Sequence, residues 1–292
     1  MVEPVLWGSA APLDERDRLG KLRRLPYGVR AVRDPMASHR STPPLPCYEE
    51  LQGNPTSPFV IACDHAGRAT LPDVGDLGVS PEDWESHIAW DIGIAGVARL
   101  LAQSLGAHVF LQNHSRLLID CNRPLDSSTS IVSVTANVPV PGNLGLAEVE
   151  IERRRDRIFR PYHRRIASVV DERVAQGVPT VFVALHSFTP LFCGCARPWH
   201  AGVLHHDDVR LAQPLLELMR KDGRWVVGDN EPYRVTDHSD YSVLEYGERR
   251  GLLHVELELR QDLIAEPDGQ RLWAAQLSKW LPQAIALVPP VT

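Results

Sequence analysis

The sequence lacks any apolar run of the ~18 residues that a membrane-spanning helix needs, so we expect no membrane partner. It also lacks a positively charged start followed by an apolar stretch, and its five cysteines are odd in number. These absences favour a soluble protein of the reducing cytoplasm. A formal net charge of −6 argues against a general nucleic-acid-binding protein, so we expect no nucleic-acid partner either.

Two catalytic signatures are missing as well. The sequence contains no G-x-S-x-G nucleophile elbow, and Ser187 directly follows His186, so on an extended strand their side chains would point in opposite directions. The "GDLG" segment at residues 75–78 has no following Gly-Lys-Ser or Gly-Lys-Thr of a phosphate-binding loop. Serine-hydrolase chemistry and phosphate binding by a glycine-rich loop are therefore disfavoured.

From residue 58 onward, short apolar strands alternate with longer helical stretches, a pattern typical of α/β proteins. The predicted strands are 58–65, 107–114, 116–124, 180–187, 224–231 and 252–260. The predicted helices are 81–105, one within 148–177, 207–221 and 268–284. Residues 1–57 show little periodicity and predict an irregular N-terminal arm. We expect one α/β domain at residues 58–292, with a mixed, largely parallel sheet flanked by helices.

Four predicted strands end in polar side chains of the kinds that bind ligands. These are Asp64 and His65; Asp120, Asn122 and Arg123; His186 and Ser187; and Asp229, Asn230 and Glu231. A lone histidine at a strand end is more often a satisfied structural group than a ligand. Four such endings are a stronger signal, because the carboxyl ends of parallel strands meet in one crevice of an α/β sheet. The sequence therefore predicts a binding site at this edge.

Two further segments offer carboxylates. In the predicted helix 81–105, Ser80 can cap the first turn and Glu85 falls on an apolar face, where a buried carboxylate needs a cation or hydrogen-bond partner. In the strand 252–260, strict alternation places Glu256 and Glu258 on the face opposite the leucines. Such a polar face is more often solvated, but it can also supply a general base beside a metal.

Five motifs resemble those of the N-formylglutamate amidohydrolase family. They are "DHAGR", "SRLLIDCNRP", "LHSFTP", "DNEPY" and "HVELELRQDL", accompanied by "HIAWD" and "GERRG", within about residues 58–285. That family is similar in turn to zinc carboxypeptidases and aspartoacylases. The resemblance implies a zinc-carboxypeptidase-like (phosphorylase/hydrolase-like) fold, a Zn²⁺ cofactor and a small acidic N-acyl amino acid as the molecular partner.

The resemblance also implies roles for individual residues. His65 and His186 match the two histidine zinc ligands, and Glu258 matches the catalytic carboxylate. Asn122 and Arg123 match the pair that binds a substrate carboxylate.

Three assignments rest on weaker matches to the family. Arg116 lies upstream of the Asn-Arg pair, as does the carboxypeptidase arginine that polarises the scissile carbonyl. Ser187 and Glu231 are assigned to substrate binding from their motifs.

The third metal ligand departs from the carboxypeptidase pattern. Carboxypeptidases carry a glutamate three residues after the first histidine, where this chain has Arg68. Our choice for the missing ligand is Glu85, with Asp91 or Asp64 as reserves.

Three functions remain open from the sequence. The first is a zinc amidohydrolase that removes a small acyl group, with formyl preferred, from an acidic N-acyl amino acid. The second is a related carboxypeptidase or N-acyl amino acid deacylase, and the third is a noncatalytic binding protein on the same fold. The sequence leaves the acyl group, the native metal and the oligomeric state open.

Overall fold

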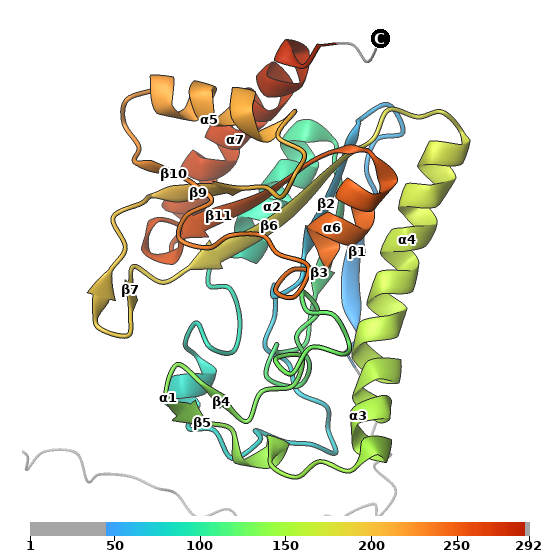
Figure 1. The fold of residues 1–292 in the computed structure, drawn as a ribbon, viewed down its shortest axis with the longest axis vertical. Coiled ribbons are helices and arrows are strands. Elements are labelled where there is room, and N and C mark those ends of the chain that lie inside the picture. Colours follow the sequence, from blue (N-terminus) through green and yellow to red (C-terminus); the bar gives the residue numbers. More distant parts are fainter. Residues whose placement is uncertain (1–44, 290–292) are drawn as a thin grey trace, which may run out of the picture. The chain divides into compact units, whose positions relative to one another are not determined.

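The computed structural model describes residues 45–289, which are built around a seven-stranded sheet (Figure 1). The strand order is β1-β3-β2-β6-β11-β9-β10. The bounds are β1 Tyr48–Leu51, β2 Phe59–Cys63, β3 His108–Gln112, β6 Val181–Phe188, β9 Ala201–Leu204, β10 Val227–Asp229 and β11 Leu253–Arg260. Neighbours from β3 through β2 and β6 to β11 are parallel, whereas β1 and β9 run antiparallel to β3 and β11. The predicted mixed, largely parallel sheet is confirmed.

The edge strand β1 lies inside the segment predicted as an irregular arm, residues 1–57. It pairs with β3 from Tyr48 opposite Gln112 to Leu51 opposite Val109. The prediction is wrong for this strand because its four residues are all half-buried, and a short edge strand of this kind has no apolar alternation to reveal it. Residues 1–44 of the predicted arm lie outside the described residues.

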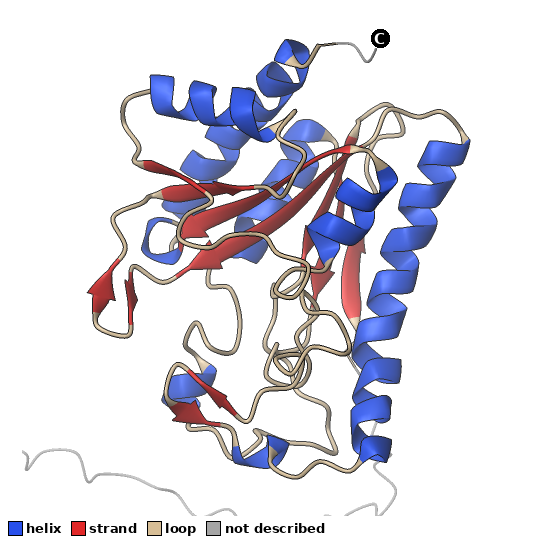
Figure 2. Ribbon diagram, in the orientation of Figure 1, coloured by secondary structure: helices blue, strands red, loops and turns tan. Residues whose placement is uncertain are grey.

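Helices cover both faces of the sheet (Figures 1 and 2). One face packs against α2 Ile94–Leu105, α5 Ala212–Lys221 and α7 Pro267–Leu287. The other face packs against α4 Arg160–Ala175 and α6 Ser242–Tyr246, and α4 continues α3 Glu148–Arg154 through a π-helical turn at Arg155–Phe159. Three predicted helices are confirmed, although the one expected at 207–221 begins only at Ala212. None of the helices within residues 45–289 is long and apolar enough to cross a membrane.

Loops fill the space beyond the carboxyl ends of the parallel strands, and most of the chain between β3 and α3 is loop (Figure 2). Two small hairpins lie among them, β4 Val134–Thr135 with β5 Val138–Pro139, and β7 Leu191–Phe192 with β8 Cys195–Ala196. Short 3₁₀ turns occur at Pro141–Asn143, Glu248–Arg250 and Gln261–Leu263.

The helix predicted at residues 81–105 is broken in two. Its start is correct, because the Ser80 side chain accepts a hydrogen bond from the Asp83 N–H and caps α1 Pro81–Trp84. The chain then leaves the helix, and α2 begins only after Gly93, which has a φ of 82°. A Cβ at Gly93 would lie 2.1 Å from the Ile264 carbonyl oxygen, so only glycine allows this re-entry.

The apolar segment 116–124 is not the predicted strand but a series of turns. Its residues Leu117 to Ile119 are buried against the α4 side of the core, which explains the strand-like pattern. Side chains satisfy the backbone instead of a neighbouring strand: Ser115 Oγ accepts from the Leu117 N–H, and Asp120 Oδ1 accepts from the Asn122 N–H. The apolar pattern of this segment reflects its burial and does not indicate a strand.

Candidate active site

A cavity of about 520 Å³ opens at the carboxyl ends of β2, β6 and β11, where loops from residues 87–91, 116–136 and 233–240 complete its wall. Seven of the nine predicted site residues line it: His65, Arg116, Asn122, Arg123, His186, Ser187 and Glu258. The parallel strands bring His65, His186, Ser187 and Glu258 together, as the sequence predicted for this edge of the sheet, whereas Arg116, Asn122 and Arg123 reach the cavity from the turns at residues 116–124.

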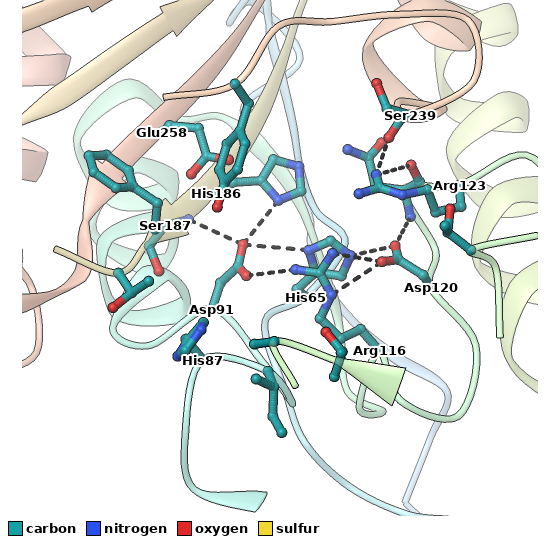
Figure 3. Close-up of a pocket in the computed structure, with 18 of the residues that line it drawn as sticks. His65, His87, Asp91, Arg116, Asp120, Arg123, His186, Ser187, Ser239 and Glu258 are labelled. Atoms are coloured by element: carbon teal, nitrogen blue, oxygen red, sulfur yellow. Dashed lines mark hydrogen bonds and ion pairs between the residues drawn. The ribbon is translucent and has the colours of Figure 1, made fainter. Parts of the chain in front are cut away.

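His65 and His186 face each other at this cavity, with their ring centroids 5.0 Å apart (Figure 3). The Asp91 Oδ2 atom lies 3.5 Å from His65 Nδ1 and 3.0 Å from His186 Nδ1. All three side chains are buried, and one donor atom of each lies within 4.8 Å of the other two. Two imidazole nitrogens and a carboxylate oxygen in this arrangement could hold a divalent metal ion.

Two more buried carboxylates lie near the far nitrogens of these histidines, and the one beside His65 is within hydrogen-bond distance. Asp120 Oδ1 lies 2.7 Å from His65 Nε2, and Asp64 Oδ2 lies 3.5 Å from His186 Nε2. A carboxylate that accepts the Nε2 proton leaves the Nδ1 lone pair free for a metal. His65 Nδ1 is buried without a hydrogen-bond partner, as expected of an atom that is free for a ligand.

The same contacts set the protonation of the cluster. Burial opposes ionisation of Asp91, but His65 and His186 hold the pKa of this carboxyl well below its usual range. Burial would lower the pKa of His186, yet the neighbouring carboxylates of Asp64 and Asp91 raise it well above its usual value. A metal competes with that proton for His186, so metal binding here would release a proton.

β11 directs two carboxylates, Glu256 and Glu258, into the cavity. Glu258 lies opposite His186 in the parallel register with β6. Burial raises the pKa of Glu258 to about 8 and raises that of Glu256 well above its usual value. One oxygen of each, Oε2, is buried without a hydrogen-bond partner. The alternative of a solvated polar face for this strand is therefore wrong.

Arg116 brings positive charge to the same cluster. Its Nη2 lies 2.7 Å from Asp120 Oδ2, and its Nη1 lies 3.6 Å from Asp91 Oδ1 (Figure 3). The guanidinium therefore lies beside the predicted metal ligands, on the wall of the cavity.

Asn122 and Arg123 hold the loop that carries Ser239 and Asp240. The Asn122 Oδ1 atom accepts hydrogen bonds from the N–H groups of Tyr241 and Ser242, at 2.9 and 3.0 Å. Arg123 Nη1 donates to the carbonyl oxygens of Asn122 and Ser239. Both residues line the cavity, so these bonds fix them at its wall.

Comparisons with known proteins agree with the motifs and the geometry. A family model described as N-formylglutamate amidohydrolase matches residues 57–265. The chain belongs to this N-formylglutamate amidohydrolase family. The resemblance predicted from the motifs is confirmed, and the chain is an amidohydrolase. No curated protein matches the sequence.

Two solved structures are similar in fold to this chain over most of its length. A gene product of Agrobacterium tumefaciens is 33% identical with a TM-score of 0.80, over 82% of this chain and 95% of that one. N-formylglutamate amidohydrolase from Ralstonia eutropha JMP134 is 18% identical with a TM-score of 0.67, over 83% of this chain and 98% of that one. At 18% identity the second likeness shows the shared fold alone.

Two residues predicted for the amidohydrolase site are not brought to it. The Glu85 side chain is 64% exposed and forms an ion pair with Arg68, because the helix that should have buried it ends at Trp84. Glu231 is exposed and lies outside the cavity lining. Glu85 therefore lies away from His65 and His186, and the reserve Asp91 is the carboxylate that the structure places within reach of both.

Ser187 lines the amidohydrolase cavity, but its polar groups are already used. Its N–H donates to Asp91 Oδ2 at 3.1 Å, and its hydroxyl donates to the Ile92 carbonyl at 3.0 Å. Ser187 thus holds Asp91 in place from the end of β6, a contact that does not require a substrate.

Sequence reasoning gave too little weight to three aspartates of this family member. Asp91 stands in the "HIAWD" motif, inside the predicted helix 81–105, but in the structure it lies in the non-helical segment between α1 and α2. Asp64 and Asp120 were noted as strand-end groups, and their contacts with the two histidines depend on the folding of distant loops. The adjacency of Asp64 to His65 was the available signal for one of them.

Proposed function

We propose that this chain hydrolyses the amide bond of an N-acyl amino acid, with N-formyl-L-glutamate giving formate and L-glutamate as the expected reaction. Family membership supports amide hydrolysis. The observation that carries the mechanism is the convergence of His65, Asp91 and His186 beside the buried carboxylate of Glu258.

A divalent metal, with zinc preferred, would be held by His65 Nδ1, His186 Nδ1 and the Asp91 carboxylate. The donor set suits zinc, which binds histidine nitrogen and carboxylate oxygen and in catalytic sites uses three protein ligands. The unpartnered His65 Nδ1 and the carboxylates behind both rings fit this assignment. When bound, the metal would polarise the amide carbonyl and lower the pKa of water.

Glu258 is the proposed general base. It accepts a proton from the attacking water and transfers it to the leaving nitrogen, which lets the C–N bond break without expelling an amide anion. Its pKa of about 8, raised by burial, suits this exchange near neutral pH. Its unpartnered Oε2 atom is free to make the transfer.

Arginines supply the remaining charge in this proposal. Arg116, held by Asp120 and Asp91, stabilises the negative oxygen that develops on the scissile carbonyl. Arg123 uses one nitrogen, Nη1, for backbone carbonyls, and its remaining donors can form a bidentate pair with the substrate carboxylate. Asn122 holds the neighbouring loop that shapes this subsite.

Metal content and formate release test the proposal together. We expect the purified protein to contain about one equivalent of metal at this cluster and to release formate from N-formylglutamate. Asp91→Asn should lose metal and turnover, whereas the matched control Glu85→Gln should keep both. Metal without formate release would favour the related deacylase or carboxypeptidase, and loss of metal in Glu85→Gln but not in Asp91→Asn would refute the ligand assignment.

Substrate analogues test the assignment of Arg123. We expect Arg123→Lys to raise KM sharply for an N-formyl amino acid, because lysine cannot form the planar two-bond contact. The analogue with an amidated α-carboxyl should bind poorly to the wild type and be little affected by the substitution. Equal losses for the acid and its amide would show that Arg123 supports the fold instead.

A further inference from the structure

A second cluster of metal-ligating side chains lies outside the cavity, in the segments that follow β9 and precede β11. It consists of His206, Asp207 and Glu248, with one donor atom of each within 4.8 Å of the other two. His206 Nδ1 lies 3.6 Å from Asp207 Oδ2 and 3.9 Å from Glu248 Oε1. We propose that this cluster is a second site for a divalent transition-metal ion.

The cluster is separate from the active site. β9 runs antiparallel to β11 with Leu204 opposite Glu256, so His206 lies toward the amino-terminal end of β11. Glu258 lies toward the other end, and about 13 Å of strand separates its backbone from that of His254. None of the three ligands lines the active-site cavity.

A buried histidine orients one of the ligands. His254 lies on β11 with its side chain 1% exposed, and its Nε2 lies 3.0 Å from Glu248 Oε2. Its Nδ1 lies 2.9 Å from the Leu252 carbonyl oxygen, so both ring nitrogens have partners. This contact holds one oxygen of Glu248 in the interior, while the other oxygen, Oε1, faces His206.

The ion pairs of the nearby arginines are with other carboxylates. These pairs are Arg210 with Asp208, Arg249 with Glu245 and Arg250 with Asp171. Within residues 45–289, Asp207 and Glu248 have ion-pair partners among histidines only. The Asp207 and Glu248 carboxylates thus face the His206 imidazole without an arginine or lysine in ion-pair contact, so a divalent cation could bind among the three side chains.

The donor set selects a class of metal. One imidazole nitrogen with two carboxylate oxygens suits zinc, cobalt, nickel or copper, whereas magnesium and calcium prefer oxygen alone. The Asp207 side chain is 89% exposed, so water can complete the coordination. We therefore expect weaker binding here than at the buried active-site cluster. A bound ion would connect the segment after β9 to the turn that precedes β11, and so would stabilise this part of the fold.

The test is a calorimetric titration of the full chain, stripped with a chelator and then titrated with Zn²⁺ alone. The wild type should show a second, weaker equivalent that disappears in His206→Ala, while His65→Ala should retain it. The second site is independent of the proposed function, so the titration measures Zn²⁺ binding and does not depend on amidase activity. The proposal would be overturned if the His65→Ala variant bound no equivalent of Zn²⁺.

Adjacent aspartates provide a matched control. Asp207→Asn should weaken the second equivalent by at least about tenfold, whereas Asp208→Asn should leave it unchanged because Asp208 pairs with Arg210. Asp207 is exposed, so its substitution should not impair folding even if His206→Ala does. Zn²⁺ should also raise the Tm of His65→Ala and have a smaller effect when Asp207→Asn is added. A second equivalent that is unchanged in Asp207→Asn would show that the cluster is only a group of solvated side chains.

Discussion

The two faces of β11 place alternate residues of one strand in very different surroundings. Leu257 and Leu259 are fully buried against the layer of α2, α5 and α7. Glu256 and Glu258 are also buried, but they line the cavity on the other face. The polar residues that alternate with the leucines of β11 therefore face a second buried surface, the cavity, and not the solvent.

The apolar face of β11 contributes mainly to folding stability, whereas the cavity face carries the side chains proposed for the chemistry. Hydrophobic burial on the helix-covered face favours folding without specifying any reaction. On the cavity face, burial of Glu258 raises its pKa, an unfavourable effect for the fold that suits a general base. Substitutions on the two faces should therefore have different consequences.

The largest expected effect is on the apolar face. Leu257→Ala should lower the free energy of unfolding by about 2–5 kcal/mol, because it removes buried methyl groups and leaves a cavity. Urea unfolding of the metal-free protein measures this loss. The folded fraction should keep its metal affinity, and a large affinity loss would show that the two faces are coupled.

A pH series tests the buried groups on the cavity side of the sheet. Burial lowers the pKa of His163 on α4 from 6.5 to about 4. Between these values the unfolded chain binds the extra proton at this residue, so the contribution of His163 to stability should fall by about 3 kcal/mol as pH drops from about 6.5 to 4. Unfolding experiments on His163→Gln should show a flatter profile over this window. An unchanged profile would assign the pH dependence to other groups.

Glu258→Gln should separate function from stability on the cavity face. We expect a loss of at least about 10²-fold in kcat, because the amide cannot accept a proton from water. Metal content should persist, and stability should not fall, since a neutral amide replaces a carboxyl whose ionisation is opposed by burial. Near-normal turnover would move the base assignment to Glu256.

The smallest expected effect concerns the carboxylate behind His65. Asp120→Asn should weaken metal binding by about 10- to 100-fold, because asparagine orients the ring less strongly and lowers its basicity. A competition titration against a chelator measures this change. The substitution also removes a partner of Arg116, so kcat should be compared at saturating metal.

The sequence predicted the parts of the site that lie on or directly after strands. His65, His186 and Glu258 come from apolar runs whose period identifies them as strands, and parallel strands bring their ends together. Asp91 could not be predicted as the third ligand with the same assurance, because its position depends on a helix break. That break is fixed by long-range contacts, such as the hydrogen bond from the Asp91 N–H to the His65 carbonyl.

The error at residues 116–124 has a different physical origin. Leu117 to Ile119 are as buried as a central strand, but local side-chain hydrogen bonds take the place of strand pairing. Apolar content reports burial, and it cannot distinguish a strand from a buried turn. The edge strand β1 shows the reverse case, a paired strand with half-buried residues.

Gly93 has a consequence for protein engineering. Replacing a glycine in an apparent helix with alanine is a common way to stabilise a protein, by about 0.4–1 kcal/mol where the backbone permits it. Here the added methyl group would collide with the Ile264 carbonyl and displace the turn that delivers Asp91. In a mutational scan Gly93 would behave like an active-site residue, although it has no side chain with which to contact a substrate.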